Sequence, residues 1–310
     1  MSSRSRRKCG ARRQGLPMDV APKTQNPRLG IFLLCAGVAF FGMGEACVKT
    51  LAKDYDILQV VWARYVFHAL VFLLIFSRSG IVSQMKTSRP LLHIARSITL
   101  MMGTITFFTA LIYLSLPEAV AINFAAPLLV TALSIPFLGE KVGPRRWAAI
   151  FVGFLGVLVI IRPGLGVMHW AAFLPLLTAI CYAAYQIMTR IAGRTEDTKT
   201  SLFWTSTVGV IVMSCIAPFV WTTPDATAWA IMVATGALFG FGHYLLIRAF
   251  EVAAVSTLSP FLYTQIVWVT IISIIVFDQI PDEYSILGTA IVIGSGLYIW
   301  HRETRERKTT

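Results

Sequence analysis

The sequence predicts an all-α membrane protein with ten transmembrane helices, arranged as two inverted five-helix repeats. Three observations lead to this fold: a low content of charge, a regular series of apolar stretches, and a resemblance between the two halves of the chain. Of the 310 residues, 56% are hydrophobic and only 14% are charged. A soluble domain carries about 25% charged residues. A lipid environment explains so large a shortfall.

Apolar stretches recur along the chain and are separated by short polar breaks. A helix needs about 20 mostly apolar residues to cross a bilayer, and ten stretches of roughly that size are present. The predicted spans are residues 29–48, 57–76, 90–114, 119–138, 144–161, 170–191, 201–221, 227–250, 254–277 and 286–300.

The distribution of basic residues predicts the orientation of these spans. If the N-terminus is cytoplasmic and the spans alternate, only Lys49, Lys53 and Arg162 of the 27 lysines and arginines fall in outside segments. Cytoplasmic loops carry the excess of such residues in membrane proteins. Both termini are therefore expected in the cytoplasm, as basic tails of residues 1–28 and 302–310, which requires an even number of spans.

The net charge of +12 has two interpretations. A basic surface that binds nucleic acid is one, and positively charged cytoplasmic loops are the other. The charges lie between apolar runs, which favours the second interpretation, and no nucleic-acid partner is expected. The first apolar run is too long for a signal peptide and lacks a cleavage site. It is predicted to be an uncleaved first helix, with either Met1 or Met18 as the start.

The two halves of the sequence end in similar patterns. Residues 125–129 lead through an apolar run to Gly139-Glu140, and residues 265–268 lead to Asp278-Gln279. A turn and a glycine-rich helix follow each run. With five spans in each half, the second half enters the membrane from the opposite side. Such inverted repeats recur among secondary transporters, and they divide this chain into residues 29–163 and 167–301.

These endings resemble the EamA domains of the drug/metabolite transporter superfamily. The first half carries the pattern as Phe137-Leu138-Gly139-Glu140-Lys141, followed by Trp147, Gly153 and Gly156. The second half departs from it at Asp278-Gln279. The resemblance covers residues 30 to 301 and implies a ten-helix fold with a central cavity between the halves.

Within the superfamily, three segments are similar to bacterial uptake carriers for riboflavin and for S-adenosylmethionine. The resemblance implies uptake of a planar, vitamin-like metabolite, with riboflavin first, S-adenosylmethionine second, and amino-acid or drug efflux third. The segments are residues 88–90, 126–141 and 242–247.

Ionisable residues at membrane depth are candidates for function, because a charge there costs several kcal/mol. Glu45 lies inside the first span and is predicted to bind a cation or proton, or to pair with Lys49 one turn later. Arg64 cannot lose its charge and shares a helix face with His68. It is expected either to form a structural ion pair with Glu45 or to bind an anionic group of the substrate.

Other polar and aromatic groups lie at the same depth in both halves. Together they are typical of a site that stacks a planar ligand and hydrogen-bonds its edge, although interfacial aromatic residues are the alternative. We expect this second set to share one central cavity with Glu45 and Arg64. The set comprises Asn123, Tyr182, Gln186, His243, Tyr263 and Gln265.

Motifs for other functions are absent from the sequence. It contains no P-loop, HExxH or GxSxG pattern, so neither ATP-driven transport nor an intramembrane enzyme is favoured, and no catalytic residue is predicted. The five cysteines form no CxxC pair, and no disulfide, metal or cofactor is expected. The predicted partners are a small-molecule substrate, the lipid bilayer and a coupled proton or ion. The protein is expected in the bacterial inner membrane, as a monomer or homodimer.

Overall fold

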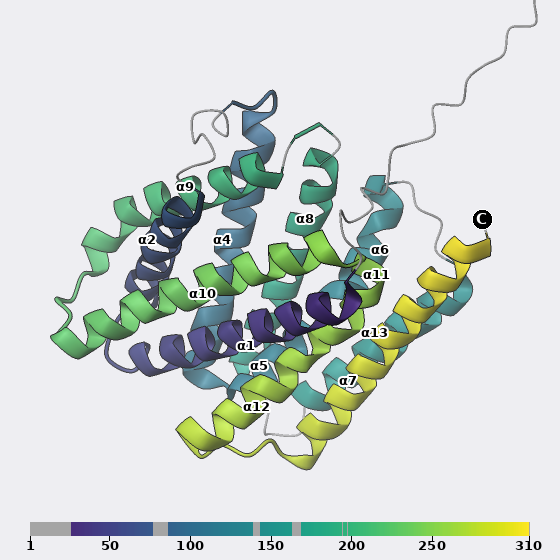
Figure 1. Ribbon diagram of the computed structural model, residues 1–310. Helices are drawn as coiled ribbons and strands as arrows, with labels where there is room; N and C mark the ends of the chain where they lie inside the picture. Colours follow the sequence, from purple (N-terminus) through teal and green to yellow (C-terminus); the bar gives the residue numbers. More distant parts are fainter. Residues whose placement is uncertain are drawn as a thin grey trace, which may run out of the picture.

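The computed structural model of the protein consists of α-helices joined by short turns (Figure 1). Within the part of the chain that it describes there is no β-strand, which confirms the predicted all-α class. The described residues are 26–76, 86–138, 143–162, 169–193, 195–196 and 198–309.

Eight long helices in the described part are uninterrupted. Short 3₁₀ turns precede or follow two of them, at Trp170–Ala172 and Ala217–Val220. The eight helices are α1 (Pro27–Leu51), α2 (Ile57–Phe76), α4 (Pro90–Tyr113), α7 (Pro144–Ile161), α8 (Phe173–Ala192), α9 (Thr198–Ile216), α10 (Ala226–Val252) and α13 (Glu283–Thr309).

The predicted fourth and ninth spans are each divided. In the fourth, α5 (Leu116–Asn123) ends at a turn of two residues, after which α6 (Ala126–Leu138) begins. In the ninth, α11 (Val255–Leu258) and the 3₁₀ helix η4 (Ser259–Tyr263) precede α12 (Thr264–Phe277). Both interruptions therefore lie within the predicted spans rather than between them.

Proline accounts for the position of both interruptions. Pro127 is the second residue of α6, and Pro260 is the second residue of η4. A proline has no N–H group and its ring clashes with the preceding turn, but it is tolerated where a helix begins. The sequence predicted a continuous fourth span with Pro127 in its interior. Instead the helix ends at Asn123 and restarts, so the missing N–H falls in a first turn.

Nine helices within the described residues are long and apolar enough to cross a membrane. They include the divided fourth and ninth spans, counted as Leu116–Phe137 and Ser259–Phe277. Helix α13, the predicted tenth span, is not among the nine. Its apolar run, residues 286–300, is shorter than the others and is flanked by Glu283 and a basic tail.

Helix ends are set by local side chains and backbone conformation. Asn26 and Asp225 each accept a hydrogen bond from the backbone N–H three residues later, and so cap α1 and α10. Helices α7 and α12 end at Arg162 and Asp278, which adopt left-handed backbone angles with φ of 51° and 53°. These two residues turn the chain sharply at the same end of the molecule.

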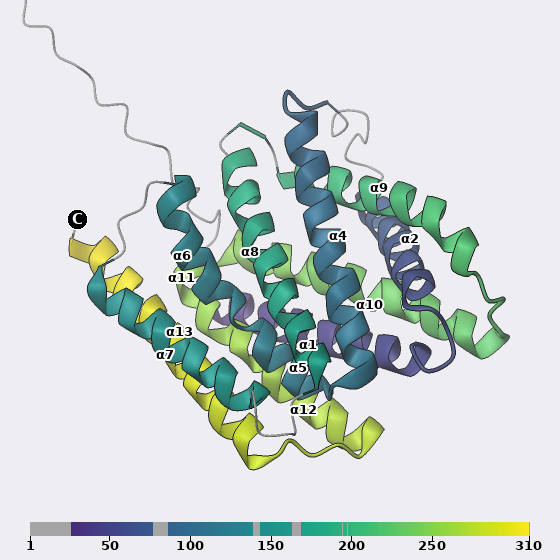
Figure 2. The same cartoon turned by 180° about the vertical axis from the view of Figure 1, so that it is seen from behind.

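The helices pack in pairs that are distant in the sequence. Helix α1 lies along α10, α4 lies along α8, and α7 lies beside α13 at one edge of the molecule (Figures 1 and 2). Glycines allow the close approaches: a Cβ atom at Gly37 of α1 would lie 3.1 Å from the carbonyl oxygen of Gly242 in α10. Small residues at such crossings are the usual basis of helix association in membranes.

The α7–α13 pair supplies a test of this packing. A Cβ atom at Gly288 would clash with the Gly156 carbonyl oxygen and with Ile160, whereas one at Gly294 would meet nothing within 4 Å. We expect Gly288→Ala to lower the thermal unfolding temperature of the purified protein, because overpacking costs about 1–3 kcal/mol.

Gly294→Ala is the matched control, since it makes the same chemical change in the same helix. It should leave the unfolding temperature unchanged or raise it slightly, because alanine favours a helix over glycine. Equal unfolding temperatures for the two variants would contradict the close approach of α7 and α13.

Candidate functional site

Glu45 is a buried carboxylate on α1, with 5% of its surface exposed. Its Oε1 accepts a hydrogen bond of 2.9 Å from Nε2 of Gln265 on α12, while its Oε2 has no hydrogen-bond partner. Gly42 and Gly44 precede it on α1 and allow α12 and α10 to approach α1 closely. The glycines of the first span thus position a carboxylate against two helices of the second half.

Arg64 on α2 lies near Glu45 but is held by other groups. Its Nη1 donates to Oγ1 of Thr104 on α4 at 3.2 Å, and its guanidinium lies over the rings of Phe239 and Tyr65, at 4.6 and 5.1 Å. The guanidinium interacts electrostatically with Glu45, but the described residues show no direct ion pair between them. Sequence reasoning missed Thr104, because nothing in the sequence distinguishes it from the other threonines of this apolar helix.

Two histidines extend this group of side chains. The rings of His68 on α2 and His243 on α10 have centroids 5.1 Å apart, and Phe41 of α1 lies 4.8 Å from His243. Nδ1 of His243 is 2.8 Å from the Phe239 carbonyl oxygen. We call Glu45, Arg64, His68, His243 and Gln265 the Glu45 cluster.

Lys49 is not a partner of Glu45 in the structure. Its Nζ donates to the carbonyl oxygens of Leu111 and Leu114, at 2.9 and 2.5 Å, at the end of α4. The last carbonyl oxygens of a helix have no hydrogen-bond donor within the helix, and a buried lysine can donate to them. The predicted alternative of a Glu45–Lys49 pair is therefore wrong: Lys49 holds α1 against α4.

A second set of predicted residues lies at the two helix interruptions. Asn123 is the last residue of α5, and its buried Oδ1 has no hydrogen-bond partner. The ring of the next residue, Phe124, lies 4.9 Å from the ring of Tyr263, which is the last residue of η4. The interruptions in the two halves therefore face each other through this aromatic pair.

Tyr182 and Gln186 form a third set on α8. They lie one turn apart, and Tyr182 keeps 40% of its surface exposed. Tyr185 lies beside Tyr182, with ring centroids 6.0 Å apart. Within the described residues no hydrogen bond or ring contact links this set to the Glu45 cluster, so a single cavity shared by all eight predicted residues stays a prediction.

Two surface hollows lie away from these residues. One, of about 450 Å³, is lined by Trp62, Ser214 and Trp221 between α2 and α9. The other, of about 350 Å³, lies between α7 and α13 beside Val152 and Gly294. Neither is lined by a predicted site residue. Their shallow, apolar linings are typical of surfaces that face lipid.

The helical fold and the buried polar clusters together define a multi-pass membrane protein with candidate sites inside its helix bundle. Residues 28–162 and 169–300 each match the model of the EamA-like transporter family. The chain therefore belongs to this family, as the sequence pattern predicted, and it is a transporter rather than an enzyme.

Relatives of known function are similar over almost the whole chain. The S-adenosylmethionine uptake transporter of Rickettsia felis is 27% identical over 293 residues, covering 93% of this chain and 97% of the relative. The riboflavin transporter of Rhizobium johnstonii is 26% identical, covering 90% and 93%. A solved crystal structure shares the fold with a TM-score of 0.60 at 16% identity, over 87% of this chain and 94% of that one.

The thermal unfolding temperature can distinguish the buried Lys49, which binds carbonyl oxygens, from the exposed Lys53. Lys49→Met leaves two carbonyl oxygens without donors, at about 1–3 kcal/mol for an unsatisfied buried group. We expect a lower thermal unfolding temperature in detergent for Lys49→Met.

Lys53→Met is the control, because Lys53 lies two residues after the end of α1 and is exposed. It should unfold like the wild-type protein. Unchanged stability of Lys49→Met would show that the lysine does not hold the end of α4.

Proposed function

We propose that this protein is a secondary carrier that imports a charged adenosyl metabolite of the S-adenosylmethionine type. The observation that carries the proposal is the buried Glu45 carboxylate, which has an unpaired oxygen beside Arg64. A buried charge without a direct partner is costly. A substrate that brings the missing charges would remove that cost.

S-adenosylmethionine has groups that complement the Glu45 cluster. Its sulfonium and ammonium groups match the free oxygen of Glu45, and its carboxylate matches a guanidinium such as that of Arg64. Its adenine ring is suited to the aromatic surface of Phe41, Phe239 and His243. Four S-adenosylmethionine uptake transporters are 26–27% identical to the chain over 93% of its length, which supports this assignment.

Riboflavin is the second candidate. The Phe124–Tyr263 ring pair and the free Oδ1 of Asn123 favour a flat ring system whose edge carries hydrogen-bond donors. Three riboflavin transporters are 26–27% identical to this chain. The sequence alone placed riboflavin first. The order is reversed here because an uncharged ring would leave the Glu45 carboxylate and the Arg64 guanidinium without a direct ion pair.

The contact pattern supports two inverted repeats with α13 as the tenth span. Exchanging the halves turns α1–α10 into α8–α4, α2–α10 into α9–α4, and α1–α12 into α8–α6. All of these pairs are in contact. The exchange also maps one interrupted span onto the other. Interrupted helices near the midplane mark the substrate site in many transporters, and we place the substrate path there, between residues 29–163 and 167–301.

The remaining assignments follow from the sequence. The distribution of basic residues supports an inner-membrane protein with both termini in the cytoplasm. Glu45 is also the residue available to a coupled proton or ion, and the protein would act as a monomer or homodimer.

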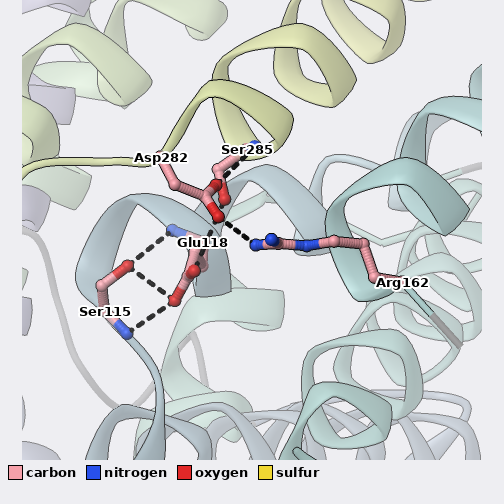
Figure 3. Close-up of polar contacts among 5 residues, drawn as sticks. All are labelled: Ser115, Glu118, Arg162, Asp282 and Ser285. Carbon is pink, nitrogen blue, oxygen red and sulfur yellow. Dashed lines mark hydrogen bonds and ion pairs between the residues drawn. The ribbon is translucent and has the colours of Figure 1, made fainter. Parts of the chain in front are cut away.

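A polar network joins the two halves at the end of the molecule that we assign to the outside (Figure 3). Glu118, at the start of α5, accepts hydrogen bonds from Ser115 at 2.8 Å and from Ser285 of α13 at 3.4 Å. Arg162, at the end of α7, forms an ion pair with Asp282. Burial alone would raise the pKa of Asp282, but hydrogen bonds from Ser285 and Arg162 outweigh it and lower this pKa.

In alternating access, such a network closes the outer end while the substrate site faces the cytoplasm. Glu118 and Arg162 belong to the first half, and Asp282 and Ser285 belong to the second. Opening to the outside moves the halves apart at this end of the molecule and breaks these contacts. The network is therefore proposed as an outer seal.

Uptake into proteoliposomes tests the substrate. Purified protein should take up labelled S-adenosylmethionine saturably, and more strongly than labelled riboflavin. Glu45→Gln should lower S-adenosylmethionine uptake at least tenfold, because a neutral amide cannot balance the sulfonium charge, while its thermal unfolding temperature stays near that of wild type.

Thr50→Val is a control on the same helix, since within the described part of the chain its hydroxyl bonds only to the Ala46 carbonyl oxygen. It should transport normally. Saturable riboflavin uptake that Glu45→Gln leaves intact would favour the second candidate. Turnover of a substrate, or conductance that does not saturate, would contradict a carrier.

The outer seal can be tested by the accessibility of Leu116, which is fully buried beside the network. In a cysteine-free background, Leu116→Cys should react slowly with a membrane-impermeant thiol reagent added outside. Asp282→Asn should speed the reaction about two- to fivefold, since a partly exposed ion pair contributes up to about 1 kcal/mol.

Asp225→Asn is the matched control. Asp225 and Asp282 both accept a backbone N–H bond at the start of a helix, and asparagine preserves that role. Only Asp282 contacts Arg162. Equal labelling rates in the two variants would rule out the seal.

A further inference from the structure

A second buried basic group lies on α4, two turns from its start and apart from the Glu45 cluster. Arg96 has 1% of its surface exposed. Its guanidinium donates to Oγ1 of Thr189 at 3.2 Å, to Oγ1 of Thr205 at 2.6 Å and to the carbonyl oxygen of Ser201. It also lies over the ring of Tyr185, 5.1 Å away. All of these partners are neutral.

The charge of Arg96 is therefore not balanced by a direct ion pair within the described residues. A buried guanidinium is stable only with a counter-charge or with hydrogen bonds for all its N–H groups. Here Nε of Arg96 has no hydrogen-bond partner. Both a charge and a donor are left unsatisfied.

The neighbouring side chains leave further polar atoms unpaired. His93 is fully buried, and neither Nδ1 nor Nε2 has a hydrogen-bond partner. Its ring stacks on Trp204 of α9, with centroids 6.0 Å apart, and the buried Nε1 of Trp204 is also unpaired. Most of these atoms are donors, so the missing partner is an acceptor.

The backbone adds positive potential at the same place. His93 and Arg96 lie in the first two turns of α4, and Trp204 lies in the second turn of α9. The start of a helix carries a partial positive charge and attracts anions. Thr189 lies in the last turn of α8, which carries the opposite partial charge, and each of these effects falls off within about one turn.

The carboxylate of Glu196, which interacts electrostatically with His93, is engaged elsewhere. Glu196 accepts hydrogen bonds from Oγ1 of Thr87 and from the backbone N–H and Oγ of Ser88, at 2.8–3.0 Å. The Ser88 bonds, followed by that from Thr87, lower the pKa of Glu196, so it stays ionised at neutral pH. It attracts His93 electrostatically without a hydrogen bond to His93 or Arg96.

We propose that His93, Arg96 and Trp204 form a binding site for a small anion, either a carboxylate or chloride. For the carboxylate, the inference rests on the proposed function, since the amino-acid end of an imported S-adenosylmethionine would supply it on the way to the cytoplasm. For chloride, the anion is a structural ligand that balances Arg96. The two sources share one chemistry, and the experiment separates them.

The test measures thermal unfolding of the purified protein by circular dichroism, without substrate or transport. Sodium chloride and sodium acetate are compared with sodium isethionate, whose anion is bulkier, at constant ionic strength. We expect chloride or acetate to raise the unfolding temperature by several degrees in a saturable manner, because a ligand that binds only the folded state stabilises it.

His93→Phe removes both ring nitrogens but preserves a ring that can stack on Trp204. The stabilisation by the anion should then be lost or reduced at least tenfold in apparent affinity. His301→Phe is the matched control, since His301 is an exposed histidine in ring contact with Trp300. It should respond to anions like the wild-type protein.

The outcomes distinguish the sources. An effect of acetate alone assigns the site to a carboxylate, and an effect of chloride alone assigns it to an inorganic ion. If neither anion stabilises the wild-type protein, or if His93→Phe responds as the wild type does, the site does not exist. Glu196→Gln tests whether the Glu196 carboxylate itself enters the site. If this carboxylate competes with the external anion, Glu196→Gln should strengthen binding of that anion. If Glu196→Gln responds to anions as the wild-type protein does, Glu196 lies outside the site and the ligand is an external anion.

Failure of the anion site and failure of the proposed substrate can be distinguished. A protein that fails to transport S-adenosylmethionine can still be stabilised by chloride through Arg96. Conversely, transport that depends on Glu45 can occur without any anion effect at His93.

Discussion

The structure depends on one constraint: polar groups at membrane depth have no water and must find partners inside the protein. Lys49 finds its partners in the carbonyl oxygens at the end of α4. Arg96 finds most of its hydrogen-bond partners in Thr189, Ser201 and Thr205. These contacts join helices that are far apart in the sequence. The costs of burial thus help to determine which helices pack together.

The buried polar groups that lack a partner are the most informative about where a ligand binds. One oxygen of Glu45, the amide oxygen of Asn123 and both nitrogens of His93 are buried without hydrogen-bond partners. An unsatisfied buried polar group costs about 1–3 kcal/mol, which a stable fold avoids unless a ligand or water supplies the bond. These groups lie on α1, on α4 and at the interruption after α5, and they mark where a substrate or ion would gain most from binding.

The polar contacts of the proposed outer seal and the glycine contacts join the two halves in different ways. Arg162–Asp282 and Glu118–Ser285 hold the halves together through exposed or partly exposed polar contacts, which are individually weak. Gly156 and Gly288 bring α7 and α13 into close backbone contact, which is harder to alter. A carrier needs both kinds of contact, because some interfaces must separate during transport while others keep the fold intact.

The sequence by itself determined the helical class, the approximate positions of nine of the ten predicted spans and the transporter family, because hydrophobic length and glycine patterns are local properties. It also identified Glu45, Arg64 and Asn123 as exceptional, because charged and amide side chains are rare at membrane depth. Only the tertiary structure showed that Gln265 rather than Lys49 bonds to Glu45, that Thr104 holds Arg64, and that both interrupted helices meet at Phe124 and Tyr263. Partners between distant segments depend on how helices cross, and the spacing of residues within one helix does not contain that information.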